Sequence, residues 1–265
     1  MRRNEINRPH APSSLFAIEP LFRRINMKLM SRMLALPTLA LTCTAAVAQV
    51  ADVSVDGYID KPAAVVRTAV SIAESMKSSR PSTCVVVLGN KGVFDYGVID
   101  PSTLSEINST QLHPIFTTFA IECPDSTKVA FRVLDHRIGS AAWSTIDAAS
   151  VHDAPAFGLG SIDGKKLGAY AMTMDTISID GRAGAVLAST NDGTSWDYAD
   201  SPAALSSRNC YEYTIAASGA TIPTAGMSFS GYLQLQAVVD SIANLPPLTN
   251  PVRVFGDAIF VVQYL

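Results

Sequence analysis

Residues 127–134 carry the clearest sign of the fold and have the sequence Thr127-Lys128-Val129-Ala130-Phe131-Arg132-Val133-Leu134. Successive side chains of a β-strand point to opposite faces, so Val129, Phe131 and Val133 fall on one face. Lys128 and Arg132 fall on the other face. This alternation predicts a strand that turns one face to an apolar core.

Similar apolar segments follow one another at short intervals along the chain. The further predicted strands are residues 92–99, 167–174, 185–189, 211–216, 227–239 and 252–265. Turn-forming pairs separate several of them, namely Asp163-Gly164, Asp180-Gly181, Asp192-Gly193 and Pro246-Pro247. Many short strands with such turns and little helix predict an all-β sandwich or barrel.

One segment has helical rather than extended spacing. Within residues 63–79, apolar side chains recur at Val66, Ala69, Val70, Ala73 and Met76. This is the spacing of one face of an α-helix, so we expect one short amphipathic helix here.

Composition excludes several classes of protein. The 265 residues are 48% hydrophobic and 16% charged, unlike the apolar-poor, charge-rich composition of disordered chains. Residues 1–48 hold seven of the 20 Lys and Arg residues but only two of the 23 acidic ones, so the remainder has a formal net charge of −8. Phosphate contacts need clustered positive charge, so we expect no nucleic-acid partner.

The basic front of the chain resembles an export signal. Met27-Lys28-Leu29-Met30-Ser31-Arg32 is a short positive region, and a small, apolar run follows over residues 33–47. Ala46-Val47-Ala48 supplies the small-x-small pattern of a cleavage site. We therefore predict a signal peptide over residues 1–48, with residues 1–26 a mis-assigned start and Met27 the true one. Residues 49–83 would form an N-terminal extension, and residues 84–265 the β domain.

Export makes the cysteine count informative. Cys84, Cys123 and Cys210 follow the predicted cleavage site, and an oxidising compartment favours one disulfide and one leftover thiol. Cys84 and Cys123 each adjoin a strand-like segment, and closing the loop between them would stabilise the fold by about 4 kcal/mol in the chain-entropy model. Cys210 is expected to be a buried free thiol. No CxxC spacing occurs, so we expect no metal site and no cofactor.

Enzyme motifs give no support for catalysis. The chain contains no G-x-S-x-G elbow, P-loop or H-E-x-x-H motif, so we expect that it is not an enzyme. Residues 189–196 (STNDGTSW) are similar to the Asp-box hairpin of sialidases and related propellers, with Asn191 where Asp is usual. Such boxes fold a hairpin and are not catalytic.

The two ends of the predicted mature chain carry more information than its middle. Near the start, Val53-Ser54-Val55-Asp56-Gly57-Tyr58-Ile59 alternates, with Gly57 in place of one apolar side chain. One interpretation is an ordinary edge strand with a glycine bulge. The other is a detachable strand that adds to the sheet of another molecule by β-augmentation. Near the end, one period-2 register contains Val254, Ala258, Phe260, Val262 and Tyr264.

Together, the export signal, the V-x-V-x-G-x-I segment, the cysteine pair near the first strands and the penultimate Tyr264 resemble a chaperone–usher fimbrial subunit (pilin). More narrowly, residues 94–97 (FDYG), 156–160 (AFGLG) and 262–265 (VQYL) resemble the fimbrial-like domain of unknown function 1120 family of Gram-negative bacteria. The resemblance covers residues 50–62 and 84–265.

This resemblance implies an incomplete immunoglobulin-like β-sandwich that lacks its last strand, with an N-terminal donor-strand extension. Val53, Val55, Gly57 and Ile59 would be the donor strand, and Cys84 and Cys123 the pilin disulfide. The register of Val254, Ala258, Phe260, Val262 and Tyr264 would line the groove and pair with the chaperone.

The implied partners are a periplasmic fimbrial chaperone, an outer-membrane usher and neighbouring fimbrial subunits. The implied location is the cell surface, reached through the periplasm. Two alternatives remain from the sequence. A secreted or tip-located carbohydrate-binding β-sandwich would use exposed aromatic residues such as Trp143, Trp196 and Tyr198. A secreted glycan hydrolase would need paired carboxylates.

Overall fold

The computed structural model describes residues 47–60, 83–142 and 156–265, with side chains from residue 50 onward. All of them belong to one compact unit, Thr44–Leu265. Most of the predicted signal peptide, the helix predicted within residues 63–79 and Trp143 lie outside the described residues.

The described residues form strands joined by turns, and their only helices are the short 3-10 turns η1 (Gly89–Gly92) and η2 (Pro101–Thr103). The strands are β1 (Val47–Ile59), β2 (Val85–Leu88), β3 (Val93–Ile99), β4 (Thr110–Gln111), β5 (Ile115–Thr127), β6 (Val129–Asp135), β7 (Phe157–Gly158), β8 (Ser161–Ile162), β9 (Lys165–Lys166), β10 (Gly168–Ile179), β11 (Arg182–Ser189), β12 (Asp197–Tyr198), β13 (Ala203–Leu205), β14 (Glu212–Ala217), β15 (Gly226–Val239) and β16 (Val252–Tyr264). The predicted all-β class is confirmed. Among these described helices, none is long and apolar enough to span a membrane.

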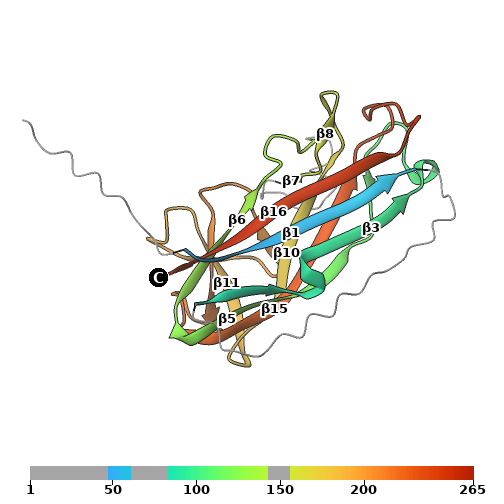
Figure 1. Cartoon of the computed structure of the whole chain (residues 1–265). Helices are drawn as coiled ribbons and strands as arrows, with labels where there is room; N and C mark the ends of the chain where they lie inside the picture. The colour runs from blue at the N-terminus through green and yellow to red at the C-terminus, as the bar shows by residue number, and fades with distance from the viewer. Residues whose placement is uncertain (1–46, 61–82, 143–155) are drawn as a thin grey trace, which may run out of the picture. The chain divides into compact units, whose positions relative to one another are not determined.

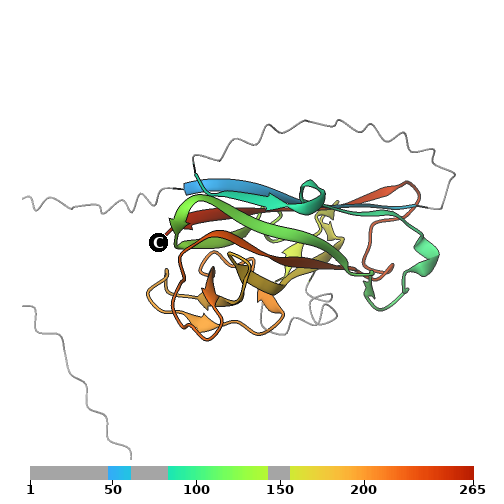
Figure 2. The same cartoon turned by 90° about the horizontal axis from the view of Figure 1, so that it is seen from below.

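Fourteen strands belong to one mixed sheet, whose main path runs β2-β5-β15-β10-β11-β14-β6-β16-β1-β3. Along this path every pair is antiparallel except β1 and β3, which run parallel. Figure 1 shows the blue strand β1 between the red strand β16 and β3. The view turned by 90° in Figure 2 shows the same neighbours.

The sheet is strongly curled into a half-barrel, as the aromatic core demonstrates. Phe119 of β5 lies near the start of the path, whereas Phe131 of β6 and Phe260 of β16 lie near its end. Nevertheless, the Phe119 ring centroid is 5.6 Å from that of Phe131 and 5.4 Å from that of Phe260. All three side chains are buried. The curl therefore brings the two halves of the path face to face around one apolar core.

Turn chemistry explains two of the tight connections. Asp180 and Gly181 join β10 to β11 with φ values of 49° and 75°. Asp163 and Gly164 join β8 to β9 with φ values of 51° and 78°. Two consecutive positive φ values are typical of the type I′ hairpin turn, which Asp-Gly favours and which matches the twist of the flanking strands. The strand pattern predicted from the sequence is thus confirmed together with these turns.

Candidate functional site

The candidate site is the N-terminal strand β1 together with the groove that it fills. Along its length β1 pairs antiparallel with β16, from Val47 opposite Gln263 to Ile59 opposite Val252. Its other edge pairs in parallel with β3, from Ser54 opposite Val93 to Ile59 opposite Ile99. The interpretation of residues 53–59 as an edge strand is therefore wrong, because β1 has a hydrogen-bonded neighbour on each side.

The side chains of β1 alternate between core and surface. Val53, Val55 and Ile59 are at most 1% exposed, and Gly57 is buried in the same row. Between them, Ser54 and Asp56 are half-buried and Tyr58 is exposed. Each fully buried aliphatic side chain contributes about 1.5–3 kcal/mol. The row predicted for a donor strand is thus the row that anchors β1 in its own sheet.

Gly57 packs closely against β3. A Cβ atom built on Gly57 would lie 3.3 Å from both Ile99 Cδ1 and Tyr96 Cβ. The register jumps here from Asp56 opposite Asp95 to Tyr58 opposite Val98, so β3 has one extra residue at this point. Such a bulge bends a strand locally. Any side chain larger than a methyl group at position 57 would have to displace β3.

The opposite wall of the groove is the inward face of β16. Its residues Val254, Ala258, Phe260 and Val262 are at most 2% exposed. Tyr264, at the end of the same row, is half-buried, and its hydroxyl accepts a hydrogen bond of 2.9 Å from the Cys84 backbone N–H. The residues assigned to the groove therefore do share one face, and the chain's own β1 covers that face.

The predicted disulfide is confirmed. Cys84, directly before β2, is bonded to Cys123 in β5, and Tyr264 fastens the same point to β16. Cys210 is a free thiol, as expected, but the expectation that it is buried is wrong. Cys210 lies in the turn before β14, where its side chain is exposed.

A charged pair on the outer face fastens β1 to β16. Arg253 donates from Nε and Nη2 to the two carboxylate oxygens of Asp56, at 2.9 and 2.8 Å. This hydrogen bonding raises the pKa of Arg253. The Arg253 guanidinium also lies 4.5 Å from the centre of the Phe255 ring. Sequence reasoning missed this pair, since the two residues lie far apart in the chain and only the register brings them together.

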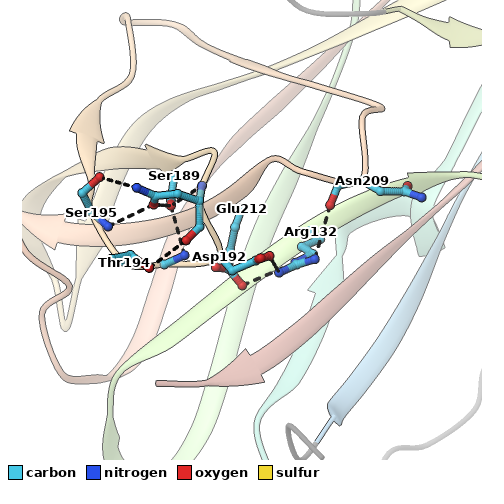
Figure 3. A network of polar contacts seen from close by, with 9 residues as sticks. Arg132, Ser189, Asp192, Thr194, Ser195, Asn209 and Glu212 are labelled. Carbon is cyan, nitrogen blue, oxygen red and sulfur yellow. Dashed lines mark hydrogen bonds and ion pairs between the residues drawn. The ribbon is translucent and has the colours of Figure 1, made fainter. Parts of the chain in front are cut away.

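The Asp-box segment does form a hairpin, between β11 and β12 (Figure 3). Ser189 Oγ accepts the Gly193 N–H at 3.0 Å, and Asn191 Oδ1 accepts the Ser195 N–H at 3.0 Å. Asn191 therefore makes the turn-closing contact in place of the usual Asp. These bonds satisfy the backbone of the loop, which agrees with the structural role expected from the sequence.

Arg132 ties this hairpin to the sheet (Figure 3). Its guanidinium donates to Asp192 Oδ1 at 2.9 Å and to Glu212 Oε1 at 3.4 Å. The Glu212 side chain is only 1% exposed, and its burial raises the carboxyl pKa, although Arg132 opposes the rise. Arg132 was predicted only to lie on the face opposite Val129, Phe131 and Val133, and the structure gives it partners in two other segments. Within the described part of the chain, no group of three His, Cys, Asp or Glu residues is arranged to hold a metal ion.

Comparison with known proteins adds one finding. Neither the curated proteins nor the solved structures include a match to this chain. Residues 75–171 match the family model described as "Protein of unknown function (DUF1120)", so this part of the chain is similar to that family.

Proposed function

We propose that the chain is a structural subunit of a surface fimbria, which polymerises when β1 of one copy fills the groove of the next. The proposal includes export through the periplasm and a structural rather than a catalytic role. It treats the curled sheet as an incomplete immunoglobulin-like sandwich completed by β1. The observation that carries it is the place of β1, the first strand of the described residues, which has a hydrogen-bonded neighbour on each side.

If β1 left the groove, apolar side chains and unpaired backbone groups would become exposed to water. It would uncover the inward row of β16, including Phe260, which is now fully buried. It would also leave unpaired backbone groups along the facing edges of β16 and β3. Apolar rows beside open strand edges associate readily with other chains. A second β1 carries the right side chains for this groove, so another copy of the chain is its natural occupant.

The connection after β1 is long enough for β1 to fill either its own groove or the groove of a neighbouring subunit. Residues 60–84 join β1 to β2, and a fully extended chain of that length reaches about 80 Å. The 13 residues of β1 span about 43 Å at the usual rise of a strand. The same segment can therefore return β1 to its own groove or carry it to a neighbouring subunit.

The proposed chaperone and usher are needed because β1 can fill either its own groove or the groove of a neighbouring subunit. A strand tethered to its own groove has an effective concentration on the order of millimolar, so it outcompetes a free subunit unless the groove is already occupied. A periplasmic chaperone that fills the groove during export, and an usher that orders the subunits, would remove this competition. The contact between subunits is head-to-tail and does not close, so it generates a filament.

The test is an unboiled SDS gel of material sheared from the cell surface, probed for this protein. The proposal predicts a ladder of bands that collapses to monomer on boiling. Gly57→Leu should abolish the ladder, whereas Asp52→Leu, at an exposed position of the same strand, should leave it intact. A single monomer band from correctly exported protein would refute the proposal.

A further inference from the structure

A second candidate site lies on the opposite half of the sheet, on the outer face of β5, β15 and β10. The register places Phe116, Gln234 and Thr173 in one row across these strands. The adjoining row contains Thr118, Tyr232 and Asp175. Side chains directly opposite or diagonal on one face of a sheet lie within reach of one another. Rings and hydrogen-bonding groups therefore alternate across a single surface.

This surface is hollowed and open to solvent. A hollow of about 240 Å³ is lined by Phe116, Thr173, Asp175, Thr176, Tyr232 and Gln234. The two aromatic residues at its rim, Phe116 and Tyr232, are 60% and 52% exposed. A second hollow of about 310 Å³ shares Asp175 and Thr176 with the first. The two hollows together offer room for a ligand of more than one ring.

A bulge in β10 creates the point where the hollows meet. The pairing with β15 skips from Asp175 to Ser178, and Thr176 has a φ of 53°, which β-branched residues rarely adopt. As a result, Asp175 and Thr176 are both exposed although they are neighbours in a strand. Gly231 makes room for the bulge, since a Cβ there would lie 2.6 Å from Ile177 Cδ1. Bulges often redirect side chains beside binding sites.

One polar group of the hollow, the Asp175 carboxylate, is held in place by the backbone. The Thr176 N–H donates to Asp175 Oδ1 at 2.7 Å, which fixes the carboxylate. Among the described residues, Asp175 Oδ2 accepts no hydrogen bond and the Gln234 amide makes none. A carboxylate oxygen and an amide beside two exposed rings suit a ligand that combines apolar ring faces with hydroxyl groups.

We propose that this surface binds an uncharged oligosaccharide. The apolar faces of sugar rings stack on Phe116 and Tyr232, and sugar hydroxyls donate to Asp175 and exchange hydrogen bonds with Gln234. No Lys, Arg or His is among the described residues that line either hollow, which disfavours sialylated, sulfated or phosphorylated ligands. The rings lie diagonally on one sheet face, which makes a platform rather than the cage that encloses a quaternary ammonium group.

Neither aromatic residue predicted from the sequence and described here belongs to this site. Trp196 and Tyr198 lie in or beside the Asp-box hairpin, and the Tyr198 hydroxyl donates to the Ala220 carbonyl at 2.9 Å. Tyr198 is 49% exposed, nearly the same as Tyr232, so it provides a matched control. The proposal does not depend on polymerisation, because the surface lies on strands other than β1, β3 and β16.

The test is binding of the purified full chain to a printed array of neutral, sialylated and sulfated oligosaccharides, with titration calorimetry on the glycans retained. We expect neutral glycans to bind and Tyr232→Ala to weaken binding at least tenfold. Tyr232→Phe, which keeps the ring, and Tyr198→Ala should bind as the wild type does. Circular dichroism would establish that each variant is folded.

Three results would overturn the proposal. One is an array on which no neutral glycan is retained, and another is binding that survives both Tyr232→Ala and Asp175→Asn. The third would come from a calorimetric titration with free choline, since binding of choline in place of sugars would identify the two rings as an ammonium site. Each outcome is independent of whether the subunit forms filaments.

Discussion

Gly57→Leu should destabilise the protein because position 57 has no room for a side chain. A methyl group there would already lie 3.3 Å from Ile99 Cδ1 and Tyr96 Cβ, and leucine adds three more carbon atoms. Overpacking of a buried site costs about 1–3 kcal/mol. For a domain of this size each kcal/mol lowers Tm by about 2–4 °C. We therefore expect Tm to fall by about 2–12 °C.

The assay is thermal unfolding followed by circular dichroism, with urea unfolding as a second measure of the free energy. Two controls accompany it. Gly57→Ala should stay within about 1 kcal/mol of the wild type, since alanine also reduces the entropy of the unfolded chain. Asp52→Leu, on the exposed face of β1, should be nearly neutral. If Gly57→Leu unfolds at the same temperature as Gly57→Ala, β3 does not pack on position 57 and the account of the groove fails.

Three further predictions concern the contacts around the sheet. Replacing Cys84 and Cys123 together by serine should lower the free energy of unfolding by about 2–5 kcal/mol, measured in urea; a smaller loss would show that the disulfide adds little to this fold. Arg253→Ala should cost less than about 1 kcal/mol, since the Arg253 side chain in its ion pair with Asp56 is 50% exposed to water, and a larger loss by thermal unfolding would contradict this. Burial raises the pKa of Glu212 above its ordinary 4.5, so the folded state holds that proton more tightly than the unfolded chain. The resulting stability is present below about pH 4.5 and is lost as the pH rises through the raised pKa; Glu212→Gln should flatten this decline in urea unfolding, and an unchanged pH profile would refute it.

Local patterns were sufficient to predict most of the strands. The alternation of Val129, Phe131 and Val133 is confirmed in β6, and Asp180-Gly181 is confirmed as the turn after β10. Both features depend on side chains next to one another in the chain. The disulfide between Cys84 and Cys123 was also predictable, because each cysteine adjoins a strand-like segment.

Features that depend on strand pairing could not be predicted in the same way. A period-2 pattern indicates which face of β1 is buried but not which strands lie beside it, so the neighbours β3 and β16 were missed. The partners of Arg132 are Asp192 and Glu212, which lie far along the chain in other strands and loops. The alternation of Phe116 and Tyr232 with polar groups likewise appears only when β5, β15 and β10 are aligned. Cys210 is exposed because it lies in the turn before β14 and not in the strand itself.

The central claim is that β1 of one subunit fills the groove of another, and disulfide trapping tests it directly. Ser54 of β1 lies opposite Asp257 of β16 in the register. One tagged copy would carry Ser54→Cys and a second, differently tagged copy Asp257→Cys, both with Cys210→Ser to remove the exposed free thiol. As a control, Ser54→Cys would be combined with Gln263→Cys, which lies opposite Val47 at the far end of the strand pair.

The measurement is a non-reducing gel of surface-assembled material from cells that express both copies. We expect a disulfide-linked product that carries both tags for the Ser54→Cys and Asp257→Cys pair, and none for the Gln263→Cys control. If assembled material from the Ser54→Cys and Asp257→Cys copies contains no product with both tags, β1 remains in its own groove and the proposed polymerisation is contradicted.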